Sequence, residues 1–499
     1  MFSKRLFAIL SVIVALSLAV LACGGGGAAT EAPDPTRTPK ATAEVEATEP
    51  EEEPTAEEEP TAEEEPTEEE APTEEAQATE EGQGIVAGEV AVTSLYGYVD
   101  EYDYFHVVGL VYNDTEDPAT SIELTLTLTD GNGDTVLTDS DGNPTDTIEF
   151  SPLLYTIAQG ETTPFDWYIN TDGADTGDWQ GTVEVTDFSD GDVDRGDVSV
   201  ENDTVFVDEY GTIYLTGELV NNSDSPVLVN SFAGALLAAD GTAVAADASY
   251  SITRYLAAAG DESGNDRTPF SVSLDGPADD ADSTVYYVDV DLADEVDIAS
   301  DIVIDITNAF VDDFDGLHIF ANVGNNGDQI LSISLVAGLY AEDGTVVDAA
   351  TASVPIYVGP GEVIPVSFDY FSATNGDSDQ VANVASYSVQ VDPYWTYETS
   401  FDVVALETAN ESSETSDGYV TFTGDVNNTS EEDLSSATLI LAIYDAEGNL
   451  FSSSWTSVYP EDDTFAPGET LPFEVTLYVP ADTDTTDFTF FTYVQGYVQ

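Results

Sequence analysis

Few side chains in this 499-residue chain could do covalent or acid-base chemistry other than carboxylates. There is one cysteine, Cys23, and there are two histidines, His106 and His318, beside 100 acidic residues. A thiolate can act as a nucleophile or a metal ligand, an imidazole as a base, and paired carboxylates as the acid and base of a glycosidase. The sequence contains no HExxH, GxSxG or Walker motif, and a carboxylate pair among so many acids carries no information. We therefore expect no enzyme, and a glycoside hydrolase or other extracellular hydrolase is the most distant alternative.

Cys23 ends an N-terminal stretch that begins with Lys4 and Arg5 and continues as an uncharged apolar run from Leu6 to Val20. This is the pattern of a secretory signal, and it is too short and wrongly flanked for a stable membrane span. The residues VLAC (20–23) resemble a bacterial lipobox, which implies cleavage before Cys23 and a lipid on its thiol. We expect a lipoprotein signal peptide over 1–22 and an extracytoplasmic, lipid-anchored protein; the alternative is an ordinary signal with an incidental cysteine.

A segment rich in Glu, Pro and Thr follows the cysteine and includes EEEPTAEEEPTAEEEPTEEE at 51–70. It has no apolar periodicity, its prolines interrupt helices, and its like charges repel one another. We expect residues 23–85 to form the lipidated Cys and a disordered, extended spacer.

Internal repeats organise the rest of the chain. The stretches VVGLVYN (107–113), LTGELVN (215–221), IFANVGN (319–325) and FTGDVNN (422–428) end in asparagines that are 108, 104 and 103 residues apart. A glycine follows each asparagine after 19 or 20 residues, and Gly-Glu-x-x-Pro recurs near the end of three units. These landmarks predict four modules, at 86–195, 196–299, 300–397 and 398–499.

Within each repeat the apolar residues alternate with a period of two, as in SIELTLTLTD (121–130) and LPFEVTLYV (471–479). Val, Ile, Thr, Tyr and Phe are frequent, and turn residues recur every 8 to 15 positions. No segment has the apolar spacing of an amphipathic helix. The predicted fold class is all-β, with four tandem immunoglobulin-like antiparallel β-sandwich modules after a signal peptide and a disordered acidic linker.

The fourth repeat contains LAIYDAEGN (441–449) followed by PGETLPF (467–473), and together these resemble the FxLYD family of bacterial extracytoplasmic β-sandwich modules. Leu441 stands where that family has Phe, and the third repeat offers AGLYAEDG (337–344) at the same place. The resemblance implies a sandwich fold and an envelope location. It implies no reaction, because that family has no catalytic residues to transfer.

The charge balance limits the partners. Glu31 to Glu81 hold 21 of the 100 acidic residues, which leaves 79 in the modules against three bases, Arg195, Arg254 and Arg267. Such an excess repels nucleic acid and anionic lipid surfaces, so no nucleic-acid partner is expected. The expected partners are the membrane, through the lipid anchor, and an envelope protein or polysaccharide. High salt or bound divalent cations would screen the repulsion.

A calcium site is a further possibility at the first module junction. In DFSDGDVDRGD (187–197), Asp190, Asp192 and Asp194 alternate, and Ca²⁺ takes six to eight oxygen ligands. The residues Asp190, Asp192 and Asp194 are therefore candidate metal ligands that could stiffen the junction. Acidic composition alone also produces such clusters, so no cofactor is the main expectation, with Ca²⁺ as the alternative.

Two other features could take part in binding. His106 and His318 each stand seven residues before a repeat asparagine, at a strand position that should face outward, and we expect them to be structural surface residues. In PYWTYETSF (393–401), Tyr394, Trp395 and Tyr397 either pack the third module onto the fourth or form a platform for sugar rings.

The sequence therefore predicts a lipid-anchored cell-envelope protein with a non-catalytic structural or binding role. An adhesin or glycan-binding protein, stiffened by calcium in one version, is the first alternative.

Overall fold

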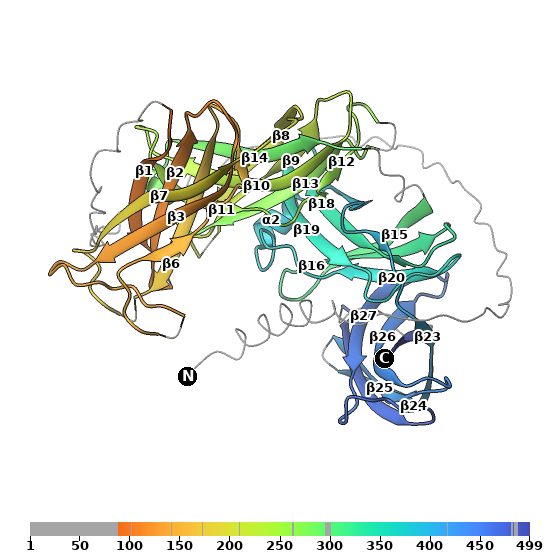
Figure 1. Ribbon diagram of the computed structural model, residues 1–499. Coiled ribbons are helices and arrows are strands. Elements are labelled where there is room, and N and C mark those ends of the chain that lie inside the picture. Colours follow the sequence, from red (N-terminus) through yellow and green to blue (C-terminus); the bar gives the residue numbers. More distant parts are fainter. Residues whose placement is uncertain are drawn as a thin grey trace, which may run out of the picture. The chain divides into compact units, whose positions relative to one another are not determined.

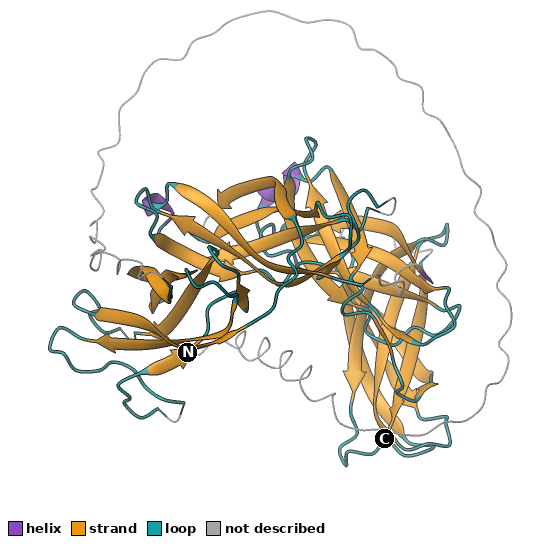
Figure 2. Ribbon diagram, turned by 45° about the horizontal axis from the view of Figure 1, so that its top comes forward, coloured by secondary structure: helices purple, strands orange, loops and turns teal. Residues whose placement is uncertain are grey.

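The computed structural model describes residues 88–499, except for residues 101, 141, 172, 209, 262–263, 295–300, 417, 481–482 and 484–487. The predicted signal peptide, Cys23 and the acidic spacer lie outside the described residues. Strands dominate the described part (Figure 2), and the helices there are short: η1 (Ala278–Asp280) and α2 (Ser378–Asn383). No helix in this part is long and apolar enough to cross a bilayer. The all-β prediction is confirmed.

The strands form four sets that follow one another along the chain (Figure 1). The first set contains β1 (Val90–Val99), β2 (Tyr104–Asn113), β3 (Ala119–Thr129), β4 (Ile148–Phe150), β5 (Thr156–Ile157), β6 (Thr162–Asn170) and β7 (Gln180–Asp190). The second contains β8 (Val198–Val207), β9 (Ile213–Asn221), β10 (Val227–Leu237), β11 (Ala243–Ala248), β12 (Tyr255–Leu256), β13 (Arg267–Leu274) and β14 (Ser283–Leu292).

The third set contains β15 (Ile302–Val311), β16 (Leu317–Asn325), β17 (Leu331–Ser332), β18 (Ser334–Tyr340), β19 (Val346–Ser353), β20 (Val363–Phe368), β21 (Ser386–Val391) and β22 (Tyr397–Glu398). The fourth contains β23 (Val403–Ala405), β24 (Glu407–Ser416), β25 (Tyr419–Asn427), β26 (Leu434–Tyr444), β27 (Leu450–Val458), β28 (Thr470–Tyr478) and β29 (Thr489–Val498). β22 spans both sides of the boundary predicted at 397/398 and pairs with β17 of the third set. We call the four sets modules 1 to 4.

Every module repeats one antiparallel sandwich topology. One sheet has the order β1-β2-β6, β8-β9-β13, β15-β16-β20 or β24-β25-β28 in the four modules. The other sheet is centred on β3, β10, β18 or β26, which pairs with the strand that follows it and with the last long strand of its module. In β3, Ile122, Leu124 and Leu126 alternate as buried residues with more exposed neighbours, so the period of two places the core between the sheets.

The repeat asparagines clamp two loops onto each sandwich. Asn325 is fully buried, and its side-chain amide donates to the carbonyl oxygens of Gln329 at 2.7 Å and Val358 at 2.8 Å. Its Oδ1 accepts from the Gly327 N–H at 2.9 Å. The same three kinds of hydrogen bond are made by Asn113, Asn221 and Asn428. The buried backbone groups of the loops thereby find partners, which explains why the residue recurs.

Neighbouring modules also cover part of each other's outer faces. Every residue of β9 is buried, although a strand with one solvent-facing side would alternate. The Thr216 hydroxyl on this strand donates to the Val346 carbonyl of module 3 at 2.6 Å. Tyr96 and Val108 of module 1 belong to the hydrophobic core cluster of module 2, and Ile440 of module 4 belongs to that of module 3. Side chains from neighbouring modules therefore meet at packed junctions.

Candidate functional site at the module junctions

Arg195 joins modules 1 and 2. Its guanidinium donates to the Thr156 carbonyl at 3.0 Å and to Glu161 at 2.9 Å, both of module 1, and to the carboxylate of Asp289 in module 2. Burial by itself lowers the pKa of Arg195, but the hydrogen bond to Asp289 and the charges of Glu161 and Asp289 outweigh it and raise that pKa. The cation is therefore firmly charged and neutralises acids from both sides of the junction.

Arg267 takes part in the contact between modules 2 and 3. Its guanidinium lies 3.2 Å from Oε2 of Glu218, a carboxylate that is almost fully buried. The other oxygen of Glu218 accepts a hydrogen bond from the Tyr340 hydroxyl of module 3 at 3.3 Å. A buried carboxylate needs such partners, because burial penalises its charge. The Arg267–Glu218–Tyr340 chain thus links the two modules.

Arg254 of module 2 also faces module 3, and it does so through aromatic rings. Its guanidinium carbon lies 5.9 Å from the ring centre of Tyr394 and 5.6 Å from that of Trp395. These are cation–π distances. The modules contain no other Lys or Arg. Every side chain of this strongly acidic region that is permanently positive therefore lies where two modules meet.

Each histidine lies between two carboxylates, and neither is the surface residue that the sequence predicted. His106 is 5% exposed, with Nδ1 at 2.9 Å from Asp166 and Nε2 at 3.4 Å from Asp100. Its ring stacks on Tyr98, whose hydroxyl donates to the Asp275 carbonyl of module 2. The expectation of a solvent-exposed side chain is wrong, because the next module covers that face.

His318 repeats this arrangement beside module 4. Its Nε2 and Nδ1 each lie 3.1 Å from a carboxylate, that of Asp312 and that of Asp369, and its ring stacks at 6.1 Å on Tyr478 of module 4. Burial lowers the pKa of His318, and the hydrogen bonds and charges of Asp369 and Asp312 outweigh it, so that the pKa is raised. The pKa of His106 is raised in the same way, by Asp166 and Asp100 against burial.

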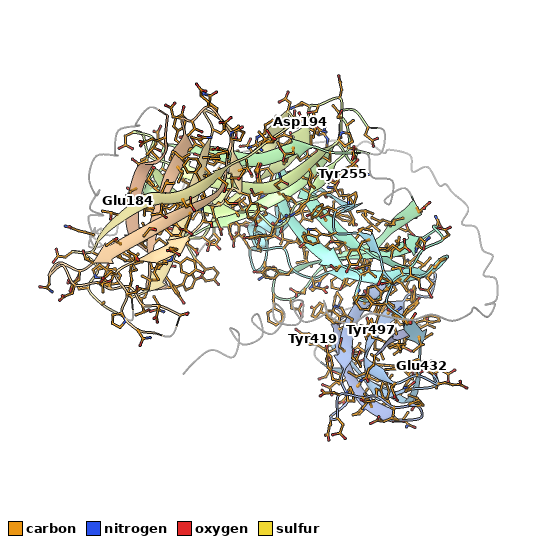
Figure 3. All side chains as sticks on the ribbon, viewed as in Figure 1. Glu184, Asp194, Tyr255, Tyr419, Glu432 and Tyr497 are labelled. Atoms are coloured by element: carbon orange, nitrogen blue, oxygen red, sulfur yellow. The ribbon has the colours of Figure 1, made fainter. Side chains whose placement is uncertain are left out.

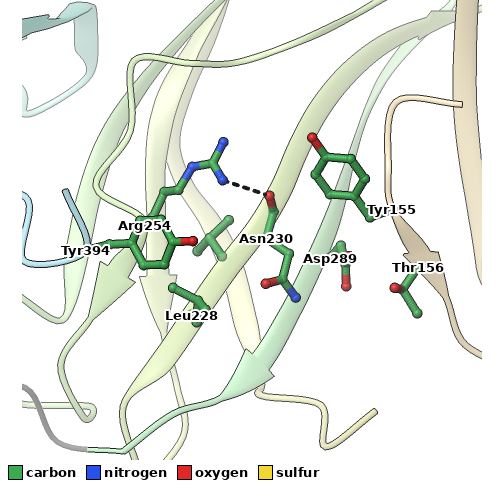
Figure 4. Close-up of a pocket in the computed structure, with 8 residues that line it drawn as sticks. Tyr155, Thr156, Leu228, Asn230, Arg254, Asp289 and Tyr394 are labelled. Atoms are coloured by element: carbon green, nitrogen blue, oxygen red, sulfur yellow. Dashed lines mark hydrogen bonds between the residues drawn. The ribbon is translucent and has the colours of Figure 1, made fainter. Parts of the chain in front are cut away.

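A hollow of about 350 Å³ opens beside Arg254, with walls from three modules. Figure 4 shows Arg254 and Tyr394 on one side of Asn230, and Tyr155 and Thr156 on the other. The remaining lining residues are Leu228, Val229 and Asp289. Tyr155 is 65% exposed and Tyr394 is 46% exposed, so the rings offer apolar surface to a ligand.

Asp289 is the one acidic residue of this lining, and it is fully buried. One carboxylate oxygen binds Arg195, whereas Oδ2 has no hydrogen-bond partner among the described residues. Burial raises the pKa of Asp289, although its hydrogen bond and ion pair with Arg195 oppose the rise. An unsatisfied buried acceptor of this kind is unfavourable.

The predicted calcium ligands are not gathered into one site. Asp190, Asp192 and Asp194 are all exposed, and the Asp194 side chain is labelled on the linker between modules 1 and 2 in Figure 3. Among the described residues, no group of three or more acidic, His or Cys side chains is placed to hold a metal ion. The calcium site stays a prediction, and Cys23 lies outside the described residues.

The aromatic stretch at 394–397 lies at a different junction from the expected one. Tyr394 and Trp395 contact Arg254 of module 2 instead of packing module 3 onto module 4, while Tyr397 belongs to β22, which pairs within module 3. All three rings remain about half exposed, at 46%, 52% and 49%. No sequence pattern identifies Arg254 as their partner or places Asp289 at the hollow. The scarcity of arginine is the one signal that could have drawn attention to Arg254.

Modules 3 and 4 meet without any Lys or Arg. The Asn308 side chain donates to the Phe451 carbonyl at 2.8 Å, and Gln495 exchanges two hydrogen bonds with the backbone of Tyr357, at 2.9 and 3.0 Å. The ring of Phe310 stacks on Phe451 at 5.7 Å. Amide hydrogen bonds and aromatic packing thus replace the arginine contacts of the other two junctions.

Comparisons of this chain with known proteins find similar solved structures but no match by sequence. No family model matches it, and no curated protein matches it. One similar solved structure is a red sea bream transglutaminase, at 11% identity and a TM-score of 0.14, covering 36% of this chain and 27% of that one. Another is a Salmonella alpha-2-macroglobulin reacted with methylamine, at 10% identity and a TM-score of 0.10, covering 81% and 28%. This chain thus spans under a third of either protein, and TM-scores this low do not indicate a shared fold.

Proposed function

We propose that this chain is a non-catalytic protein of the bacterial cell envelope, held by a lipid on Cys23, that presents four joined β-sandwich modules beyond an acidic spacer. The observation that supports the structural role is the placement of the arginines. Arg195 and Arg254 each contact a group of a neighbouring module, and Arg267 pairs with Glu218, which accepts a hydrogen bond from Tyr340 of module 3. The anchor and the location rest on the N-terminal sequence pattern.

The strong negative charge of the chain explains why the position of its few arginines matters. With a formal net charge of −93, neighbouring modules repel one another, and the repulsion is largest where their acids approach. A cation buried between two acids removes repulsion there, while a cation on the free surface is screened by solvent and salt. Arg195 and Arg267 accordingly bind acids that are buried, Asp289 and Glu218. Because these two arginines pair with buried acids at the junctions, we infer a role in which the modules stay packed together.

The anchor can be tested with Cys23→Ser, and Thr30→Ser serves as a control outside the lipobox. Cells of the native host are fractionated and the membrane proteins are partitioned with Triton X-114. We expect the wild type and the control to enter the detergent phase at mature size, and to be removed from intact cells by added protease. The Cys23→Ser protein should either leave the detergent phase as released protein or stay there at precursor size, because the uncleaved signal is itself apolar. A mature-sized Cys23→Ser protein in the detergent phase would refute the lipoprotein assignment.

A further inference from the structure

We propose that the hollow beside Arg254 is a binding site for a neutral saccharide of one or two pyranose rings. The proposal goes beyond the structural role and does not depend on the lipid anchor. It differs from a platform made of Tyr394, Trp395 and Tyr397 alone, because it takes its walls from modules 1, 2 and 3.

The size and the rings of the hollow fit a sugar. Its volume of about 350 Å³ lies at the small end of ligand pockets, which suits one or two sugar rings rather than a long chain. Tyr155 and Tyr394 both line it, stand on opposite sides of Asn230 in Figure 4, and are well exposed. Aromatic faces pack against the apolar face of a pyranose, and an exposed tyrosine loses little conformational freedom on doing so.

The polar groups of the lining suit hydroxyl groups. Arg254 supplies a guanidinium at the hollow, and its position is set by a hydrogen bond to the Asn230 carbonyl at 3.4 Å. The side-chain amide of Asn230 also lines the hollow and donates to Asp291 at 3.0 Å, which leaves its oxygen for a ligand hydroxyl. Asp289 is fully buried behind the lining and its Oδ2 lacks a partner among the described residues, so a ligand hydroxyl would supply the missing donor if a small shift of the lining exposes this oxygen on binding. A few such polar groups on an otherwise apolar lining give a pocket its specificity.

The charges of the lining favour a neutral ligand. Asp289 is already paired with Arg195, and the guanidinium of Arg254 already lies over the rings of Tyr394 and Trp395. An anion would meet the negative field of the whole region, and a second cation would meet Arg254. A ligand without charge that donates hydrogen bonds avoids both penalties.

The test measures binding of cellobiose, maltose and N,N′-diacetylchitobiose to the purified full-length chain by calorimetry and saturation-transfer NMR, together with an array of neutral glycans. Choline is the cationic probe and glucuronic acid the anionic one. Tyr155→Ala and Tyr394→Ala change exposed rings and should leave the fold intact, which circular dichroism checks. The matched control is Tyr459→Ala, which removes a tyrosine of module 4 that is 69% exposed and away from the hollow lining.

We expect at least one neutral glycan to bind, with its affinity reduced at least tenfold by each of Tyr155→Ala and Tyr394→Ala and unchanged by Tyr459→Ala. Arg254→Gln should also weaken binding. Three results would overturn the proposal: no binding of any neutral glycan, glycan binding that both tyrosine variants retain, or binding of choline or glucuronic acid in preference to the neutral sugars.

Discussion

Gly109 lies opposite Phe165 in the register of β2 and β6, and the phenyl ring fills the space that a side chain at position 109 would need. Phe165 is fully buried, so the ring has nowhere else to go. The same relationship joins Gly217 to Phe270 and Gly424 to Phe473, while the third module has Ala321 opposite Val366. In the third module, Val366 is smaller than the phenylalanine of the other modules, and this leaves room for the methyl group of Ala321.

This pairing predicts the effect of Gly424→Ala. A Cβ at position 424 would lie 2.9 Å from ring carbons of Phe473 and 3.0 Å from the Ala409 carbonyl oxygen. Overpacking of this kind costs about 1–3 kcal/mol, so the free energy of unfolding should fall by that amount in a denaturant titration followed by circular dichroism. Adding Phe473→Val should restore part of the loss.

The control for that experiment is Gly324→Ala on β16, where the nearest atom to a new Cβ lies 3.5 Å away. This variant should unfold within about 0.5 kcal/mol of the wild type. Equal losses for Gly424→Ala and Gly324→Ala would show that the close approach of Phe473 is not the cause.

Arg195→Gln should strongly destabilise the junction of modules 1 and 2. The substitution leaves the fully buried Asp289 without its charge partner, and breaking a buried ion pair in this way costs about 3–5 kcal/mol. Calorimetry of the full chain should show a lower melting temperature for the transition that includes these modules. Adding Asp289→Asn removes the stranded charge and should recover much of the loss.

Arg254→Gln provides the comparison for Arg195. Arg254 stacks on rings that are about half exposed, and such a cation–π contact contributes about 0.5–1 kcal/mol. Its loss should therefore be several times smaller than that of Arg195→Gln. A larger loss for Arg254→Gln would contradict the view that burial of the paired acid sets the effect.

The stability of the protein should increase as the pH falls from 8 to 5.5. Burial raises the pKa of Asp348 to about 7 against backbone hydrogen bonds that lower it, and burial also raises the pKa values of Asp247 and Asp392 to about 6. The pKa values of His106 and His318 are raised as well. A group with a raised pKa in the folded state favours folding when protonated, and this stability is lost as the pH rises through that pKa.

Protonation of each of these five groups therefore stabilises the fold as the pH falls through this window. The carboxyl groups with lowered pKa values titrate below the window and do not oppose this effect. The melting temperature should be higher at pH 5.5 than at pH 8 by at least about 5 °C, measured by calorimetry at constant ionic strength. In His318→Gln, which cannot be protonated, the difference should shrink. A melting temperature that rises with pH would contradict the assignment of these shifts.

Salt should stabilise the modules through their surface charge. The described part carries three arginines against a large excess of acids, and the Debye length falls from about 8 Å at 0.15 M salt to about 3 Å at 1 M. We expect the melting temperature to rise between these concentrations of NaCl. A flat or falling curve would mean that surface repulsion does not limit stability.

Calcium is the second arm of the salt experiment. A site made by Asp190, Asp192 and Asp194 predicts that millimolar CaCl₂ stabilises the wild type beyond NaCl of equal ionic strength, and that Asp192→Asn removes the increment. Asp240→Asn changes an exposed turn carboxylate elsewhere and should keep it. An increment that survives Asp192→Asn would belong to general screening by divalent ions.

The sequence by itself determined the local structure of this protein. The alternation of apolar residues and the turn glycines specify strands and hairpins, and the recurring asparagines mark the repeats, because each pattern depends on neighbours within one module. The same patterns predicted the inward face of β3 and the homology of the four repeats.

Only the tertiary structure decided what happens on the outer faces. A period of two shows that His106 and Leu110 lie on the same side of their strand, but it cannot show whether solvent or another module covers that side. The partners of Arg195 in module 2 and of Tyr394 lie 94 and about 140 residues away along the chain, and no periodicity connects them. Burial of Asp289, pairing of the arginines and formation of the hollow depend on module packing, which is set by the summed shape and charge of two surfaces.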